Sequence, residues 1–419
     1  MNSALPGALP KREVSLVNKK LKVVTGVASL GLLSSFALTI PAQAASAPKV
    51  KPWKVATSAA EGGGLDALVK AAQKEGELNL IATPRDWADY GDAIDTFSKA
   101  FHIKINSDNP DGSSAEEIVA IKTTKNLAKM PDVVDIGMSV LDDAQGLLAP
   151  YKVRNWGDIP NAVKDPDGQW YGAYAGKLAL WYDTSVTPAP TAIKDLSNPA
   201  YKGMVALPGD PTAAQQALMS VMATSIANGG SVANVQKGVD FFKTLKSNGN
   251  FVAVKGNAAN FVAGSFKISI GWDYNAIGYT NEAKKVNKTV KYVYPSDANV
   301  QGTPYALAVN KTAPHPAAAR LWEEYMFSQV NGALAAGVGA NDWKTLTGTK
   351  LMAKIMGGQN TYILGGAHPT TEPAMITKGS AVASPAGIPI PANWPKMVVP
   401  SVDYQNAASE VLKQAWPNL

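Results

Sequence analysis

Residues 65–82 read LDALVKAAQKEGELNLIA, a helix followed by a short apolar strand. The apolar side chains of the helix recur on one face, at Leu65, Leu68, Val69 and Ala72. Gly76 ends this helix, and residues 77–82 form the strand. A helix over 90–101 with a strand over 103–107, and a helix from Ser114 with a strand over 133–136, repeat the pattern. This β-α-β-α-β order predicts a parallel sheet with helices on both faces.

A second α/β block follows along the chain. Asp210 with Pro211 is predicted to open a helix, as Ser114 with Glu117 does in the first block. Strands are predicted over 268–272, 290–294 and 305–309, and a strongly amphipathic helix begins at Pro316. The sequence therefore predicts an α/β protein with two sheets.

The first 44 residues are typical of a secretory signal peptide. A basic stretch precedes the apolar segment 23–40, and Ala42-Gln43-Ala44 gives a cleavage site before Ala45. An uncleaved membrane anchor is the alternative, because the apolar segment is near the lower length limit for a span. Residues 1–44 carry a net charge of +4, so their removal by cleavage lowers the formal charge of the chain from +6 to +2. Such a balanced surface gives no reason to expect nucleic acid as a partner.

The composition excludes several kinds of chemistry. The 419 residues are 46% hydrophobic and include no cysteine, so disulfides, zinc–thiolate sites and a cysteine-linked lipid anchor are excluded. The chain has three histidines and carries no metalloprotease, serine-hydrolase, P-loop or dinucleotide-binding motif. The acidic pairs Asp142-Asp143 and Glu323-Glu324 are expected to be solvated. We predict no catalytic residue, metal site or cofactor.

Carboxylates and aromatic rings follow the predicted strands at the edge where open parallel sheets bind ligands. The candidate ligand-binding residues are Arg85, Asp86, Trp87, Asp89, Tyr90, Ser113, Ser114, Asp210, Trp272, Asp273 and Tyr274. Rings with carboxylates suit a cation. The turn at 112–114 and Arg85 instead suit an anion. Turn capping and core packing are the alternatives for the individual residues.

Several short motifs in fixed order resemble the extracellular solute-binding proteins of ABC importers, in the group that includes ferric-iron, polyamine and aminophosphonate binders. They are MPDVVD (130–135), GQWYG (168–172), DL (195–196), PAYKG (199–203), WDY (272–274), YALAVNK (305–311) and APHPAA (313–318). The resembling stretches run from about Leu65 to Ser328.

The resemblance implies a two-lobed type II periplasmic-binding-protein fold. Each lobe would hold a mixed, mainly parallel sheet flanked by helices, and the chain would cross between lobes near 178–182 and near 303–307. The implied division after a flexible lead-in over 45–60 is first lobe 61–182, second lobe 183–303, and then 304–419, which returns to the first lobe and wraps the surface.

The resemblance also implies a function without catalysis. The lobes would close on a small polar ligand and deliver it to an ABC permease in the membrane. An amine or polyamine ranks first as ligand, an aminophosphonate or other oxyanion second, and ferric iron third, because the adjacent tyrosine pair of iron-binding members is missing. We expect a monomer, secreted to the periplasm or cell-wall zone without a lipid anchor. The rival functions are a secreted carboxylate-dependent hydrolase and a surface adhesion module.

Overall fold

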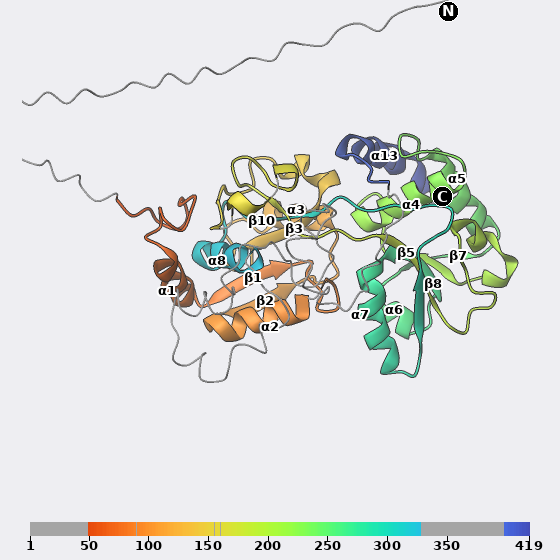
Figure 1. The fold of residues 1–419 in the computed structure, drawn as a ribbon, viewed down its shortest axis with the longest axis horizontal. Coiled ribbons are helices and arrows are strands. Elements are labelled where there is room, and N and C mark those ends of the chain that lie inside the picture. The colour runs from red at the N-terminus through yellow and green to blue at the C-terminus, as the bar shows by residue number, and fades with distance from the viewer. Residues whose placement is uncertain (1–48, 89, 155, 160, 328–397) are drawn as a thin grey trace, which may run out of the picture. The chain divides into compact units, whose positions relative to one another are not determined.

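The computed structural model describes residues 49–327 and 398–419, apart from 89, 155 and 160. The predicted signal peptide lies outside the described residues. Within them the chain builds two five-stranded sheets flanked by helices (Figure 1). No helix in these ranges is long and apolar enough to cross a membrane.

The first sheet has the strand order β2-β1-β3-β10-β4. Its strands are β1 (Glu77–Ile81), β2 (Lys104–Asp108), β3 (Val133–Gly137), β4 (Tyr171–Gly172) and β10 (Tyr305–Val309). Strand β1 runs parallel to β2 and β3, whereas β10 runs antiparallel to β3 and β4.

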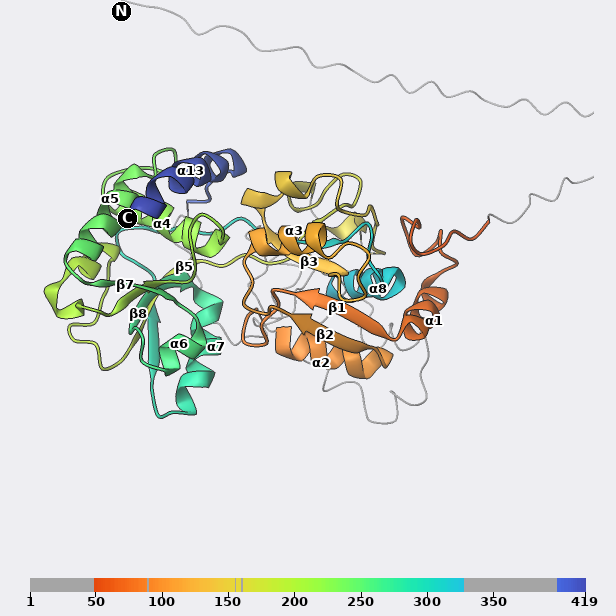
Figure 2. The same cartoon turned by 180° about the vertical axis from the view of Figure 1, so that it is seen from behind.

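Helices cover both faces of the first sheet, as the sequence predicts. These are α1 (Leu65–Glu75), α2 (Tyr90–Phe101), α3 (Ser114–Thr123) and α8 (Pro316–Met326). Helices α1, α2 and α8 share one apolar cluster with Leu80 and Val133, while α3 packs with Val134 and Ile136 on the other face (Figure 2). Because side chains alternate along β3, this strand contributes residues to two separate hydrophobic cores, one on each face of the sheet.

The second sheet has the order β7-β6-β8-β5-β9. Its strands are β5 (Leu178–Asp183), β6 (Val205–Leu207), β7 (Phe251–Lys255), β8 (Ile268–Trp272) and β9 (Val290–Val293). Its helices are α4 (Gln215–Ala227), α5 (Gln236–Ser247), α6 (Ala258–Val262) and α7 (Asp273–Lys284). Strand β6 is parallel to β7 and β8, and β5 is antiparallel to β8 and β9.

The predicted α/β architecture with mixed sheets is confirmed. Antiparallel pairing has a larger share than predicted, because β5 and β10 each enter their sheet from the other one and run against its central strand. Residues 173–177 lead from β4 into β5, and residues 294–304 lead from β9 into β10. The predicted first crossing at 178–182 is therefore strand β5 itself.

The two crossing segments are joined to each other. The backbone N–H of Gly302 donates to the carbonyl of Gly176 at 2.9 Å. The Trp272 side chain fills the space beside both glycines. A Cβ added at Gly302 would lie 2.4 Å from the Trp272 ring, and a Cβ added at Gly176 would lie 2.7 Å from the Trp272 Cβ. Only a residue without a side chain fits at these two positions.

The C-terminal helix α13 (Val402–Ala415) packs against α4 and α5 of the second sheet and against the 3-10 turn η1 (Met138–Val140), which follows β3 of the first. It is followed by a 3-10 turn, η7 (Trp416–Asn418), whose Trp416 ring meets Phe242 at 5.5 Å. Helix α13 thus contacts elements of both sheets, and Trp416 packs on the second.

Two helix starts differ from the sequence prediction. The capping box of α3 is formed by Ser113 and Glu116, one residue earlier than predicted. Asp210 does not cap a helix, because its carboxylate accepts hydrogen bonds from the backbone N–H and hydroxyl of Thr212 in a turn, and α4 begins at Gln215. A turn and a cap use the same short acidic side chain, so the local sequence does not separate them.

The pair Glu323-Glu324 is buried, and the predicted solvated face is wrong there. Helix α8 is covered on all sides by α1, α2 and the first sheet. The Glu324 carboxylate accepts hydrogen bonds from the Tyr151 hydroxyl and the Arg154 backbone N–H, and its pKa is raised by burial. Within the predicted lead-in, Ala56 is also buried, and its carbonyl accepts a hydrogen bond from Arg320.

Candidate functional site

A cavity of about 820 Å³ is lined by residues from the loops of both sheets. The first sheet contributes the loops after β1 and β2 and the start of α3, and the second contributes the loop after β6, the start of α4 and strand β7. The cavity lies where the sequence predicts, beyond the carboxyl ends of the parallel strands. Its volume suits a small organic molecule, since such sites measure about 300–1,000 Å³.

Asp135 is the carboxylate at the centre of the site. It lies in β3, whose five residues VVDIG are all buried, and it lines the cavity. Its Oδ2 accepts hydrogen bonds from the hydroxyls of Tyr90, at 2.8 Å, and Tyr174. Its Oδ1 is buried and has no hydrogen-bond partner among the described residues. Burial raises the pKa of Asp135 to about 6, against the lowering effect of the two tyrosines.

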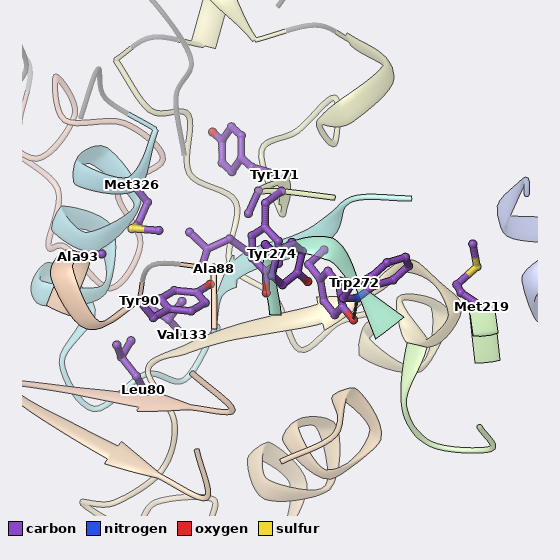
Figure 3. Close-up of a cluster of buried hydrophobic side chains, with 14 of the residues drawn as sticks. Leu80, Ala88, Tyr90, Ala93, Val133, Tyr171, Met219, Trp272, Tyr274 and Met326 are labelled. Carbon is purple, nitrogen blue, oxygen red and sulfur yellow. Dashed lines mark hydrogen bonds between the residues drawn. The ribbon is translucent and has the colours of Figure 1, made fainter. Parts of the chain in front are cut away.

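Aromatic rings from several separate segments lie near this carboxylate. Tyr174, in the first crossing segment, and Tyr305, at the start of β10 where the second crossing segment ends, stack with ring centroids 5.1 Å apart. Trp87, from the loop after β1, lies 5.5 Å from Tyr274 and donates its indole N–H to the Tyr174 hydroxyl at 2.8 Å. Figure 3 shows Tyr90, Tyr274 and Trp272 in this region. Burial raises the pKa of Tyr174 and of Tyr305, so both remain neutral phenols.

A second buried acid, Glu117, also lines the cavity. It lies in α3, and its carboxylate accepts a hydrogen bond from the backbone N–H of Asp135 at 2.8 Å. Burial raises its pKa well above the usual range, and the neighbouring charge of Asp135 adds to that effect. Burial therefore disfavours the ionised form of Glu117.

The second sheet presents amide side chains to the cavity. Gln215 bridges segments of both sheets, since its Oε1 accepts the Ser139 N–H at 3.4 Å and its Nε2 donates to Thr303. Asn275 donates to Gln216 Oε1 at 3.3 Å. The Nε2 of Gln216 and the Oδ1 of Asn275 are buried without a partner among the described residues. Buried polar atoms of this kind are normally satisfied, so they are candidate ligand contacts.

The lining carries more negative than positive charge. Its acids in the described part of the chain are Asp86, Asp111, Glu116, Glu117, Asp135 and Asp210. The basic residue among the described lining is Lys255, whose ammonium donates to the Asp111 carbonyl from the opposite side. No group of three or more His, Asp or Glu in the described ranges is arranged to hold a metal ion.

Five of the predicted site residues line the cavity: Asp86, Trp87, Ser113, Ser114 and Asp210. Asp86 is partly buried, which raises its pKa. Ser113 and Ser114 are engaged within the protein, because the hydroxyl of Ser113 bonds Glu116 and that of Ser114 accepts the Gly137 N–H at 2.9 Å. The predicted anion contact at this helix start is thus already occupied by the Glu116 carboxylate.

The remaining predicted residues do not line the cavity, and Asp89 lies outside the described residues. Arg85 is exposed and pairs with Asp95 at 2.5 Å. Tyr90 acts on the cavity through its hydrogen bond to Asp135. Trp272 is fully buried beside the crossing segments, and its indole N–H donates to Tyr305 at 3.0 Å.

Asp273 is buried at the start of α7 and does not line the cavity. Its Oδ1 accepts the backbone N–H of Lys177 at 3.2 Å and of Tyr274 at 3.0 Å, and its Oδ2 accepts the Tyr294 hydroxyl at 2.9 Å. The first turn of α7 and a crossing segment thus hold the carboxylate. Tyr274 is buried as well, but its ring packs on Trp87 and Tyr174 at the edge of the cavity.

Sequence reasoning missed Asp135, Glu117 and the tyrosines of the crossing segments. The available signal for Asp135 is an acid within a run of otherwise apolar strand residues, since an ionised side chain is rarely buried without a purpose. Tyr174 and Tyr305 carry no such local signal, because their place depends on how the two crossing segments meet.

Two open α/β sheets joined by crossing segments, with a cavity at the strand ends, define a ligand-binding protein of the periplasmic class. The sequence model of a family described as bacterial extracellular solute-binding protein matches residues 129–340, half of the chain. The chain therefore belongs to the bacterial extracellular solute-binding proteins.

Solved structures support the fold. The periplasmic binding protein P5PA is 18% identical with a TM-score of 0.54, covering 82% of this chain and 98% of its own. AfuA from Actinobacillus pleuropneumoniae, solved with fructose-6-phosphate bound, is 18% identical with a TM-score of 0.53, covering 82% and 97%. A Listeria monocytogenes protein assigned to spermidine/putrescine ABC transport is 16% identical with a TM-score of 0.52, covering 81% and 99%. The search of curated protein sequences finds no match.

Proposed function

We propose that this protein is the solute-capturing component of an ABC importer and that its ligand is an organic amine. It would act as an exported monomer without a lipid anchor and without catalysis, closing on the ligand and presenting it to a membrane permease. Family membership supports the carrier function. The amine is supported by the site itself.

The observation that carries the proposal is the unpartnered oxygen of Asp135. A buried carboxylate with one free oxygen is unstable without a compensating partner. An ammonium group at Oδ1 would supply both the missing hydrogen bond and the opposite charge. Two tyrosine hydroxyls already fix the orientation of the carboxylate, so the ligand would meet a preformed acceptor.

The rings around Asp135 add a second reason. Trp87, Tyr174 and Tyr305 line the cavity, and their faces attract a cation by about 0.5–2 kcal/mol each when water is excluded. Neutral phenols serve this purpose, and the raised pKa values of Tyr174 and Tyr305 keep them neutral. The acids in the described lining outnumber its basic residue, Lys255, and this negative charge also favours a cationic ligand.

An oxyanion is the second candidate. Helix α4 begins at the cavity without a side-chain cap, and the Nε2 of Gln216 lacks a partner there among the described residues. Backbone N–H groups at a helix start bind phosphate-like groups. AfuA, a structural neighbour, holds a sugar phosphate. Ferric iron remains third, since the buried tyrosines would have to ionise against a raised pKa.

Thermal-shift and calorimetric titration of the exported protein distinguishes these ligands. Primary amines are expected to raise the melting temperature in a saturable manner, because a ligand that binds the folded state alone stabilises it. Phosphonates, sugar phosphates and ferric citrate are expected to leave it unchanged. A saturable shift with a phosphonate, together with none for any amine, would replace the amine by the oxyanion and leave the carrier function intact.

A further inference from the structure

The cavity has an apolar extension along strand β7. Strand β7 is an edge strand of the second sheet, and Phe251, Ala253 and Lys255 lie on the same face of it because side chains alternate. All three line the cavity. Phe251 packs against Phe242 of α5, whereas Ala253 is exposed, so the strand face is open at Ala253.

An aromatic pair closes the far end of this extension. Trp416, in the 3-10 turn after α13, lines the cavity and lies 6.2 Å from the Phe251 ring. The side walls are apolar as well. We call this region the apolar arm and define it by Leu207, Ala213, Ala214, Phe251, Ala253 and Trp416.

The apolar arm runs away from the place where loops of the two sheets meet. Lys255, at the end of β7, donates to the Asp111 carbonyl of the first-sheet loop. Phe251 stands at the start of the same strand, and five extended residues span about 13 Å. A ligand that fills the arm is therefore elongated, with one end near the first-sheet acids and the other at Trp416.

The charges beside the apolar arm select the chemistry of the distal end. Lys255 stands at the opposite end of β7 from Phe251, beside the first-sheet loop, so a second ammonium at the distal end of the ligand would meet apolar side chains. Asp210, the acid nearest to Ala213 in the loop, turns its carboxylate to the N–H and hydroxyl of Thr212. No described acid of the lining lies on the β7 face to bind a distal cation.

We propose that the ligand is an elongated monoamine with an apolar distal end. This inference rests on the proposed function: the ammonium binds at Asp135, and the apolar end lies along β7 against Trp416 and Phe251. A short diamine or a polyamine would leave the apolar arm unfilled or place a charge in it. The arm therefore discriminates by chain length and by the charge of the distal end.

Calorimetric titration of the exported protein with butylamine, octylamine and diaminooctane tests the proposal. Octylamine is expected to bind at least about tenfold more tightly than butylamine, since each buried CH₂ contributes about 0.8 kcal/mol. It should also give a more negative heat-capacity change. Diaminooctane is expected to bind no more tightly than butylamine, because its second ammonium enters the arm.

Two variants locate the effect. Trp416→Ala and Ala253→Trp, the second filling the arm from an exposed position, should each bring the ratio of octylamine to butylamine affinity close to one. Trp170→Ala, a half-buried tryptophan of the first sheet outside the cavity, is the matched control and should change neither affinity. Ala253→Trp gives the result if Trp416→Ala does not fold.

The outcomes separate the two levels of inference. If no amine binds, the proposed amine function fails. If butylamine and octylamine bind equally, if diaminooctane binds most tightly, or if both arm variants keep the octylamine advantage, the apolar-arm proposal is overturned while amine binding stands. Loss of the octylamine advantage in each arm variant that folds, with the advantage kept in Trp170→Ala, supports it.

Discussion

Each sheet has a buried aspartate in its central strand or directly after it, and the two side chains have opposite surroundings. Asp135 in β3 has one oxygen held by two tyrosines and one without a partner among the described residues. Asp273, directly after β8, has both oxygens bonded to Lys177, Tyr274 and Tyr294. Asp135 lines the cavity and Asp273 does not. Position on or beside a central strand therefore does not tell which acid faces the cavity.

The difference arises from the segment that each strand enters at its carboxyl end. Strand β8 runs directly into α7, so Asp273 occupies the first turn of a helix, where backbone N–H groups are available. Strand β3 ends at Gly137 and leads into the 3-10 turn η1 (Met138–Val140), and Asp135 itself is still within the strand. The N–H of Asp135 donates to Glu117, and its side chain is held by two tyrosine hydroxyls, with Oδ1 left without a partner among the described residues. Internal bonding decides which acid is left for a ligand.

The largest expected effect is that of Asp135→Asn on amine affinity. Removing the charge leaves the bound ammonium in a desolvated cavity without its counterion, which costs about 3–5 kcal/mol. Amine affinity should fall by about a hundredfold or more, since ~1.4 kcal/mol is tenfold. Calorimetric titration at pH 8 measures it. The unfolding free energy should not fall, because the substitution removes a charge that burial disfavours. Unchanged amine affinity would exclude Asp135 as the anchor.

The matched substitution Asp273→Asn should give the reverse pattern. The substitution replaces one carboxylate oxygen of Asp273 by an amide NH₂, which cannot accept a hydrogen bond. Either the hydrogen bond from the Tyr294 hydroxyl or those from the backbone N–H groups are then lost. A lost charge-assisted hydrogen bond costs about 1.5–3 kcal/mol, so the unfolding free energy should fall by about 2 kcal/mol. Chemical denaturation at pH 8 checks this. Amine affinity should change by less than about threefold. A hundredfold loss of affinity with normal stability would instead make Asp273 the ligand-binding acid.

The architecture was predictable because it depends on local patterns. The apolar stripe and Gly76 that define α1, and the apolar run of β1, lie within eighteen consecutive residues, and the observed β1 bounds differ from the predicted ones by one residue. The α3 start was misplaced by one residue, since Ser113 and Ser114 are both followed three residues later by an acid.

The candidate site was less predictable because it depends on contacts between distant segments. The free oxygen of Asp135 results from where Tyr90 and Tyr174 lie, 45 and 39 residues away along the chain. The pair Glu323-Glu324 has the sequence of a solvated face, and packing of α1 against α8 buries it. Trp416 reaches the cavity only through the packing of α13 on the second sheet. The hydrophobic periodicity of a sequence does not indicate such contacts between distant segments.

The smallest expected effect is the pH dependence of amine binding, which also distinguishes the two aspartates. An alkylammonium stays protonated between pH 5 and 8, because such amines titrate near pH 10. Asp135 must be ionised to pair with it, and its pKa is about 6. Amine affinity should therefore be constant above about pH 7 and fall by about tenfold for each pH unit below 6. Titrations at pH 5, 6, 7 and 8 measure this slope.

The unfolding free energy of the ligand-free protein should show the opposite pH dependence, with an Asp135 contribution that decreases as the pH rises. The folded state binds the Asp135 proton more tightly than the unfolded chain, whose aspartates titrate near pH 4. The Asp135 contribution is then fully favourable below about pH 4 and is lost as the pH rises through about 6. Bound amine reverses this trend by favouring the ionised carboxylate. Asp135→Asn should flatten the affinity profile, whereas Asp273→Asn should keep the wild-type slope. A profile that rises toward low pH would contradict pairing between Asp135 and the ammonium.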